Sequence, residues 1–284
     1  MNSNHSVGGQ AVIEGVMMRG KDRIAVAVRK EDNSIVTQCD PLNSVLIKYP
    51  FLKLPILRGF IALIESLVLG VQALNFSANQ AAGEGEEIKP IEMFFTLLLS
   101  LALAGGLFIV APALTIDLFH RFTDNVIVVN FLEGIVRIII FLIYVYAISR
   151  LPDIQRVFQY HGAEHKVIHA HEAGEELTVG NAMKYNAVHP RCGTSFLLIV
   201  MVISVFAFSL LGKQDMIARV GSRFLLVPLI AGVSYEFLKI SGKYPNHPLL
   251  RIFILPGLWL QQLTTREPDE KQVEVAIVAL KKVL

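Results

Sequence analysis

Four long apolar runs constrain this chain more than any other feature of its sequence. Each has about the 20 residues that a helix needs to cross the hydrocarbon core of a bilayer. Hydrophobic residues also make up 53% of the chain, which is high for a soluble protein. The sequence therefore predicts a mainly α fold, a polytopic membrane helix bundle with about four transmembrane helices and the lipid bilayer as its partner. The runs are Met93 to Leu118, Val126 to Ser149, Thr194 to Gly212 and Ser222 to Ile240.

The connectors indicate how the spans pair and which way they face. "DLFHRFTDN" and "KQDMIARVG" are short, as expected for the turns of two transmembrane hairpins. Lys and Arg are dense before the first run, recur in the central loop after residue 150 and return after the last run. Because positive residues are enriched on the cytoplasmic side, both termini and the central loop are predicted to be cytoplasmic.

Shorter segments flank the spans. Apolar and polar residues alternate from Arg23 to Arg29 and from Ser34 to Cys39 around a polar turn, which predicts an N-terminal β-hairpin. The stretch 57–76 has a helical period but carries charged residues, so it either lies in the interface or lines the bundle. The stretch 249–263 is too short to cross, and Pro256 is expected to break a helix there, which favours an interfacial or re-entrant segment.

These features predict seven segments along the chain. They are 1–56, an N-terminal cytoplasmic segment with the hairpin; 57–80, an amphipathic or interfacial helix; 81–92, a linker; 93–149, the first transmembrane hairpin; 150–193, a cytoplasmic His-rich helix and loop; 194–240, the second transmembrane hairpin; and 241–284, a cytoplasmic or interfacial tail.

Charge and cysteine content exclude other classes of protein. A net charge of +2, without a dense basic run, predicts no nucleic-acid partner. The two cysteines, Cys39 and Cys192, lie far apart in the sequence and form no disulfide framework, which is typical of a reducing compartment.

One stretch, "QYHGAEHKVIHAHE", contains four of the chain's eight histidines. A Leu-Pro-Asp sequence from residue 151 predicts the start of a helix that runs to about residue 173. On that helix His161, Glu164 and His165 share one face with apolar residues that must be buried. Buried polar groups need partners, so this face is a candidate site.

The His-x-x-Glu-His spacing points to a metal. Histidines one helical turn apart can offer two nitrogens to one ion, and the glutamate can act as general base on a bound water. We therefore predict zinc or another divalent transition metal on His161 and His165, with Glu164 catalytic. The alternative is a hydrogen-bonded cluster that joins the helix to the bundle. His169 and His171 are weaker candidates, because histidines are common near helix C-termini.

Such a site needs a further protein ligand, and three candidates stand elsewhere. Glu236 lies near the inner end of the last run, and an intramembrane carboxylate is a functional candidate by default. His189 and Cys192 lie in "HPRCGTS", directly before the third run. Cys192 as a nucleophile would need a base and an orienting group that the sequence does not place. A second buried acid, Glu133, is expected to pair with Arg137 along its helix in a structural role.

Four separated motifs, taken in order, resemble one family. "GGQAVIEGVMMRG", "YHGAEHK", "HPRCGTSF" and "SYEFLKI" are similar to the YqhQ-like family of bacterial inner-membrane proteins, a domain of unknown function whose members are predicted to be metal-dependent enzymes. The resemblance spans nearly the whole chain and implies a multi-pass protein of the bacterial cytoplasmic membrane, with no assigned reaction. The metal-site residues that it implies are His161, Glu164, His165, His189, Cys192 and Glu236.

Three functions remain open at this level. The leading hypothesis is a metal-dependent hydrolase with its site at the cytoplasmic membrane face. The first alternative is a transporter or channel for protons or metal ions, in which Glu65, Glu236 and the histidines line a path and a homo-oligomer supplies further spans. The second is a noncatalytic scaffold with a structural metal. The sequence indicates no substrate.

Overall fold

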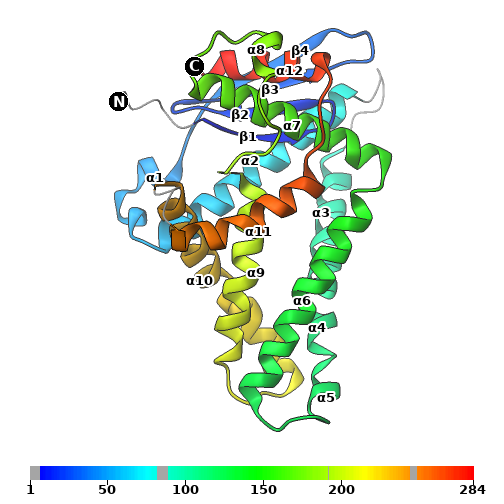
Figure 1. Cartoon of the computed structure of the whole chain (residues 1–284), viewed down its shortest axis with the longest axis vertical. Coiled ribbons are helices and arrows are strands. Elements are labelled where there is room, and N and C mark those ends of the chain that lie inside the picture. The colour runs from blue at the N-terminus through cyan, green and yellow to red at the C-terminus, as the bar shows by residue number, and fades with distance from the viewer. Residues whose placement is uncertain (1–6, 82–88, 191, 244–247) are drawn as a thin grey trace.

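The chain forms an elongated molecule with a sheet and several helices at one end and long helices extending from them (Figure 1). The computed structural model describes residues 7–81, 89–190, 192–243 and 248–284. Most of the predicted linker, residues 82–88, lies outside the described residues. The prediction of a mainly α fold with a small N-terminal β element is confirmed.

The β element is an antiparallel sheet of four strands that follow one another in chain order. The predicted hairpin is present as its last two strands, in which Arg29 pairs with Ile35. The first two strands come from "GGQAVIEGVMMRG", a glycine-rich stretch that lies before the predicted hairpin. The strands are β1 (Gly8–Val12), β2 (Gly15–Arg19), β3 (Arg23–Arg29) and β4 (Ile35–Pro41).

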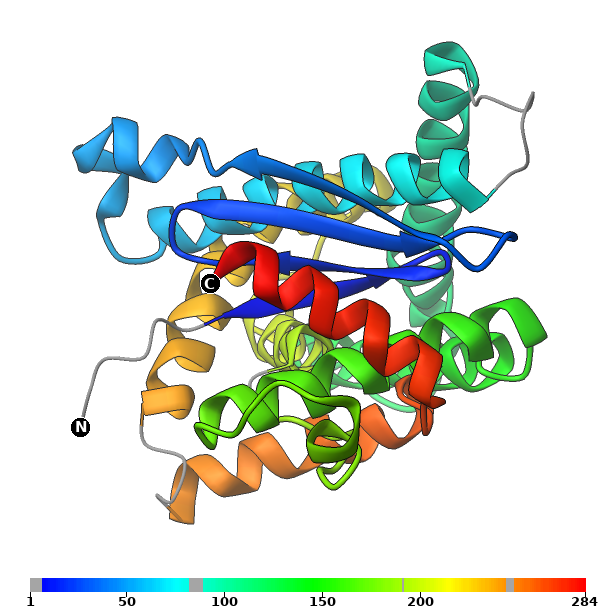
Figure 2. The same cartoon turned by 90° about the horizontal axis from the view of Figure 1, so that it is seen from above.

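Helices cover both faces of this sheet (Figure 2). One face packs on α7 (Pro152–Glu172) and α12 (Glu270–Val283), and the other packs on α2 (Leu57–Ala81). Successive strand residues point to opposite faces, so Val16 and Met18 join the core with α7 and α12, while Met17 joins the core with α2. Strands β2 and β3 are therefore apolar on both sides.

The C-terminal helix α12 ties the two ends of the chain together. Its start is a capping box, in which Asp269 accepts from the backbone N–H of Gln272 at 2.8 Å and Gln272 accepts from that of Asp269 at 2.9 Å. Val273, Ala276 and Leu280 are fully buried in the sheet core. Parts of the predicted segments 1–56, 150–193 and 241–284 thus pack as one unit. We call this unit, β1–β4 with α2, α7, α12 and the short α8 (Val179–Ala182), the head.

The long helices outside the head form the membrane part of the protein. Among the described residues, four helices are long and apolar enough to span a membrane: Leu57–Ala81, Ile91–Phe119, Val126–Ile148 and Met216–Ser241. The second of these has several parts, α3 (Pro90–Gly105), the π-helical turn η2 (Gly106–Val110), α4 (Ala111–Ala113) and α5 (Ile116–Phe119). The other long elements are α6 (Val126–Ile148), α9 (Gly193–Ser209) and α10 (Met216–Lys243).

Helix α9 is shorter than the run that predicted it. It ends at Ser209 and has 17 residues, about 26 Å at 1.5 Å per residue, because the chain turns into the connector before Gly212. Helix α2, whose role the sequence left open, meets the length and composition of a span. In Figure 1, however, it crosses the long axis, and it packs between the sheet and α10. Its contact with α10 is close, because a Cβ on Gly59 would lie 2.7 Å from Tyr235.

Helix α11 (Pro248–Thr264) continues through Pro256, so the predicted break at that proline is wrong. The helix tolerates the loss of one backbone hydrogen bond, and Gly257 next to it packs directly on α9, where a Cβ would lie 2.6 Å from the hydroxyl of Ser195. Like α2, α11 crosses the long axis near the head (Figure 1). Short turns α1 (Val45–Lys48) and η1 (Pro50–Lys53) connect β4 to α2.

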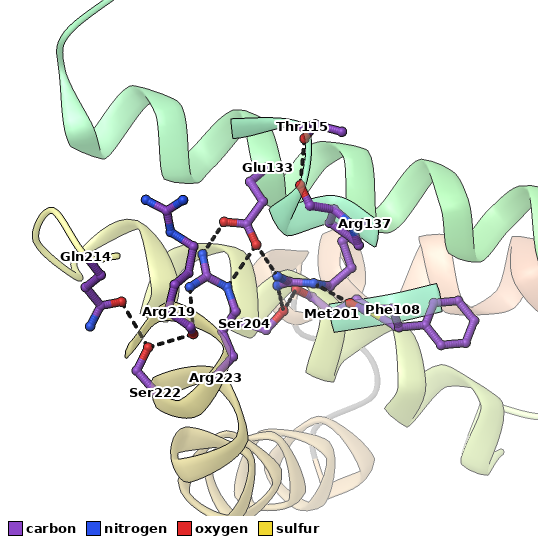
Figure 3. A network of polar contacts seen from close by, with 11 residues as sticks. Phe108, Thr115, Glu133, Arg137, Met201, Ser204, Gln214, Arg219, Ser222 and Arg223 are labelled. Carbon is purple, nitrogen blue, oxygen red and sulfur yellow. Dashed lines mark hydrogen bonds and ion pairs between the residues drawn. The ribbon is translucent and has the colours of Figure 1, made fainter. Parts of the chain in front are cut away.

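A buried charge network holds the long helices together (Figure 3). The expected pair is present, with Arg137 donating to Glu133 at 2.7 Å, and Arg223 of α10 also donates to Glu133, at 2.8 Å. Arg137 further donates to the carbonyl of Phe108 at 2.9 Å, which brings in the π-helical turn. Both guanidiniums lie over the ring of Phe208, at 4.8 Å and 5.2 Å. The network therefore joins four elements, α6, α9, α10 and η2.

We expect Glu133→Gln to destabilise the bundle, because it leaves two buried guanidiniums without the carboxylate that they share. Breaking a buried ion pair typically costs about 3–5 kcal/mol. The check is the midpoint of thermal unfolding of the purified protein in detergent. Asp124→Asn, in the exposed connector before α6, is the matched control and should leave the midpoint unchanged. Equal midpoints for the two variants would contradict a stabilising network.

Candidate metal centre

The histidine-rich helix is present as predicted and carries the candidate site. Helix α7 spans Pro152–Glu172, close to the predicted bounds. Its residues Tyr160, Ala163 and Val167 are fully buried against the sheet. His161, His165 and His169 follow one another at intervals of four, so they lie in a row along the helix. Adjacent rings in the row are close, with 4.4 Å between the centroids of His161 and His165.

Two of these histidines meet Cys192 at one point. The possible ligand atoms of His161, His165 and Cys192 all lie within 4.8 Å of one another. The Nε2 atom of His161 is 3.2 Å from the Sγ atom of Cys192. In a tetrahedral zinc site the nitrogen and sulfur ligand atoms are about 3.3–3.6 Å apart. The three side chains therefore lie close enough together to share one metal ion, and we call them the first group.

Backbone carbonyls orient both imidazoles of the first group. His161 donates from Nδ1 to the carbonyl of Thr264 at 2.8 Å, and His165 donates from Nδ1 to that of Ala187 at 2.6 Å. A carbonyl can only accept, so Nδ1 of each ring carries a proton, and in a neutral ring Nε2 then presents a lone pair. Metal-binding histidines are commonly oriented by such a contact. Burial, and then the charge of His161, lower the pKa of His165 far below its usual range, so this ring is neutral near pH 7.

Cys192 is placed by the start of α9. It is the N-cap residue, and its Sγ accepts from the backbone N–H of Thr194 at 3.4 Å and lies 3.1 Å from the hydroxyl of Thr194. Burial raises the pKa of the thiol, while the contacts with Thr194 lower it by less. A thiolate at this position would therefore need a cation beside it.

Glu164 lies beside the first group but faces the sheet. Its buried carboxylate accepts from the backbone N–H of Gly9 in β1. A Cβ on Gly9 would lie 2.9 Å from the Oε1 atom of Glu164, so glycine is needed for this approach. Burial raises the pKa of Glu164 to about 7, while the charge of His161 lowers it. The catalytic role of Glu164 stays a prediction.

The side chain of His189 belongs to a different cluster from that of Cys192, although the backbone N–H of Cys192 donates to the carbonyl of His189 at 3.3 Å. The His189 side chain lies with His169 and Glu172, and the possible ligand atoms of these three residues are within 4.8 Å of one another. We call them the second group. Burial lowers the pKa of His189 to about 4, so its ring is neutral near pH 7. The sequence analysis predicted that His189 shares a site with Cys192, and it did not identify Glu172. The four-residue spacing, which continues from His165 to His169, was the signal in the sequence for a further ligand on this helix.

Glu236, the third candidate ligand, lies in neither group among the described residues. Its carboxylate receives two hydrogen bonds from Arg58 of α2, one of them 2.6 Å long from Nε to Oε1. This ion pair joins α2 to α10 on the membrane side of the head. The geometry therefore supports a structural role for Glu236 in this ion pair. The role of Glu236 as a metal ligand stays a prediction.

The loops that surround α7 depend on a glycine. A Cβ on Gly162 would lie 2.1 Å from the carbonyl oxygen of Arg266 and 3.3 Å from the Cβ of Ala187. The carbonyl of Ala187 orients His165, and Arg266 follows closely after Thr264, whose carbonyl orients His161. Glycine at this position thus allows both loops to approach the helix.

We expect Gly162→Ala to lower the free energy of unfolding by about 1–3 kcal/mol, the usual cost of overpacking. The measurement is denaturation of the purified protein in detergent. Gly180→Ala is the control, because a Cβ there meets no atom within 4 Å. If Gly162→Ala is as stable as the control, the loops are not held as tightly as the contacts indicate.

Comparison with known proteins supplies the family. The family model described as "Protein of unknown function (DUF1385)" matches residues 54–284. The chain is 36% identical over 309 aligned residues to the uncharacterized protein YqhQ of Bacillus subtilis (strain 168), and the alignment covers 99% of this chain and 94% of that relative. No solved structure matches significantly. The chain therefore belongs to the DUF1385 family, as its resemblance to YqhQ-like membrane proteins predicted.

Proposed function

We propose that this membrane protein is a metal-dependent enzyme of the hydrolase type, with His161, His165 and Cys192 as its metal ligands. The observation that supports this proposal is the convergence of their three ligand atoms within 4.8 Å, with both imidazoles oriented by backbone carbonyls. The Nε2 atom of His161 has the thiol of Cys192 as its partner, at 3.2 Å, and a thiol is a weak hydrogen-bond donor. As an imidazole and a thiolate, the same two groups would suit a zinc ion.

The ligand set favours zinc and a catalytic role. Two imidazole nitrogens and one thiolate are ligands that zinc prefers, and structural zinc sites commonly have four protein ligands. Three protein ligands leave one position open, as in catalytic zinc sites. A zinc ion held there would act as a Lewis acid and lower the pKa of a bound water.

Glu164 is the proposed proton acceptor. Its carboxylate is close enough to His161 and Cys192 for their charges to act on it, and the N–H of Gly9 holds one side of it. A general base also needs a pKa near the operating pH, and burial raises the pKa of Glu164 to about 7. In this proposal Glu164 takes a proton from water and returns it to the leaving group.

The proposed centre lies where the head meets the membrane helices. Cys192 caps α9, whose apolar length extends away from the head, and Thr264 ends α11 (Figure 1). Substrates that approach along the membrane surface would reach this junction first. The N-terminal strands and the C-terminal helix both belong to the head, which supports the proposal that both termini are cytoplasmic in a bacterial membrane.

A thiol enzyme is the second candidate, and one contact favours it. His161 lies 3.2 Å from Cys192 and is oriented by the carbonyl of Thr264, so the base and the orienting group that a nucleophilic cysteine requires are both present. The buried environment that raises the pKa of the thiol works against this reading. The two candidates differ in the expected effect of zinc on Cys192. In the zinc enzyme, bound zinc blocks the reactivity of the thiol, whereas in the thiol enzyme Cys192 reacts with or without zinc.

The transporter and the scaffold stay alternatives. The transporter hypothesis relied on Glu65, Glu236 and the histidines to line a path for protons or metal ions. Glu65 lies 3.7 Å from Arg19 and also accepts from the backbone of Val45, and Glu236 is paired with Arg58. Carboxylates held in this way are less available for transport, so the first group gives the hydrolase the stronger support.

We expect the double variant His161→Ala/His165→Ala to lose the metal ion of this centre. Cobalt(II) is the probe, in a Cys39→Ser background, because a thiolate bound to cobalt gives a charge-transfer absorption in the near ultraviolet that then reports on Cys192 alone. The wild-type protein should show this band and the double variant should not. His120→Ala, in the connector far along the chain from the centre, should behave as wild type. A wild-type protein without the band would refute the proposal.

We expect zinc to protect Cys192 from alkylation, because a bound thiolate is no longer free to react. The experiment uses a Cys39→Ser background, since Cys39 is exposed and would react regardless. Labelling with iodoacetamide, followed by mass spectrometry, should be slower with zinc than with a chelator. Equal and rapid labelling in both conditions would favour the thiol enzyme.

A further inference from the structure

The second group is a separate cluster of metal-ligand side chains beside the first. His169, Glu172 and His189 place one possible ligand atom each within 4.8 Å of the others. The rings of His169 and His189 are 4.4 Å apart between centroids, and those of His165 and His189 are 5.7 Å apart. The two groups are therefore neighbours along α7, about one helical turn from each other.

The spacing within the second group is that of ligands around a cation. The Nε2 atom of His189 lies 3.4 Å from the Oε2 atom of Glu172, which is long for a hydrogen bond between these groups. A nitrogen and an oxygen bound to one zinc ion in tetrahedral geometry are about 3.3–3.4 Å apart. These two atoms form a long hydrogen bond, and their separation also matches that of two ligands on one shared ion.

The two histidines of the group are held in position by other contacts. Gln261 of α11 accepts from the backbone N–H of His189 at 2.9 Å and donates to its carbonyl at 2.9 Å. His169 contacts the carbonyl of Val188 at 3.0 Å through Nε2, and its ring stacks on Tyr185 with 11° between the planes. A site with fixed ligands loses little conformational entropy when an ion binds.

The group is also accessible to an ion from solution. Glu172 is exposed, His169 is partly exposed and His189 is buried, so the cluster runs from the surface to the interior. Two imidazoles and a carboxylate form a ligand set that suits zinc, manganese, iron(II) and cobalt(II). This set lacks the sulfur of the first group, and that difference makes the two sites distinguishable by spectroscopy.

We propose that His169, Glu172 and His189 bind a second divalent transition-metal ion, next to the centre formed by His161, His165 and Cys192. The proposal goes beyond the proposed function, because this site is built from different side chains and can be occupied whether or not the first one is. The ion would lie on the solvent side of the first centre.

The test counts bound ions in the full-length protein, purified in detergent without a polyhistidine tag. The protein is stripped with a chelator, loaded with cobalt(II), dialysed and analysed by elemental mass spectrometry. We expect Glu172→Gln to bind one equivalent less than wild type and to keep the thiolate charge-transfer band. Glu172 is exposed, so its replacement by the isosteric amide should not disturb folding.

Two further variants complete the design. His169→Ala should lose the same equivalent as Glu172→Gln, while His171→Ala, on the same helix but in neither group, should match wild type. If Glu172→Gln and His169→Ala bind as many ions as wild type, the second site is refuted. A missing thiolate band in wild type would instead refute the first centre. The number of ions bound by wild type and by the two variants would still test the second site.

Discussion

Every other feature of the candidate centre depends on the burial of α7 between the sheet and the ends of the membrane helices. Residues 162–168 of this helix are buried on all sides, and they include Glu164, His165 and Lys166. A polar group taken from water must find a partner inside the protein. The irregular chain around α7 supplies these partners with its carbonyl groups.

The chain segments near α7 therefore hold the carbonyl groups that orient the imidazoles. Lys166 donates to the carbonyls of Met183 and Tyr185, at 3.1 Å and 2.6 Å, and so holds the segment that leads to Ala187 and His189. Gln261 of α11 holds the same segment through hydrogen bonds with the backbone N–H and carbonyl of His189. Fixed carbonyls then decide which ring nitrogen carries a proton. The orientation of the histidines is thus a property of the packed loops more than of the helix that carries them.

Buried charges also need partners in the membrane part, where the burial of charge is still more costly. Glu133 is shared by Arg137 and Arg223, and the two guanidiniums find their remaining acceptors in backbone carbonyls and a serine. The network fixes α6 and α10 relative to each other. Because α9 packs against both, the position of Cys192 at its N-cap follows from the arrangement of the bundle.

Local patterns in the sequence determined the elements that depend on neighbouring residues. Hydropathy predicted the long helices, the Leu-Pro-Asp start predicted α7, and the four-residue spacing predicted that His161 and His165 share a face. The predicted hairpin did not extend to "GGQAVIEGVMMRG", where β1 pairs with β2 and β2 pairs with β3. The predicted break at Pro256 was wrong, because packing on α9 keeps the helix continuous there. Only the tertiary structure decided that Cys192 joins His161 while His189 joins His169 and Glu236 joins Arg58. These partners come from separate elements, and the packing of the head on the bundle, which no local pattern records, sets the distances between them.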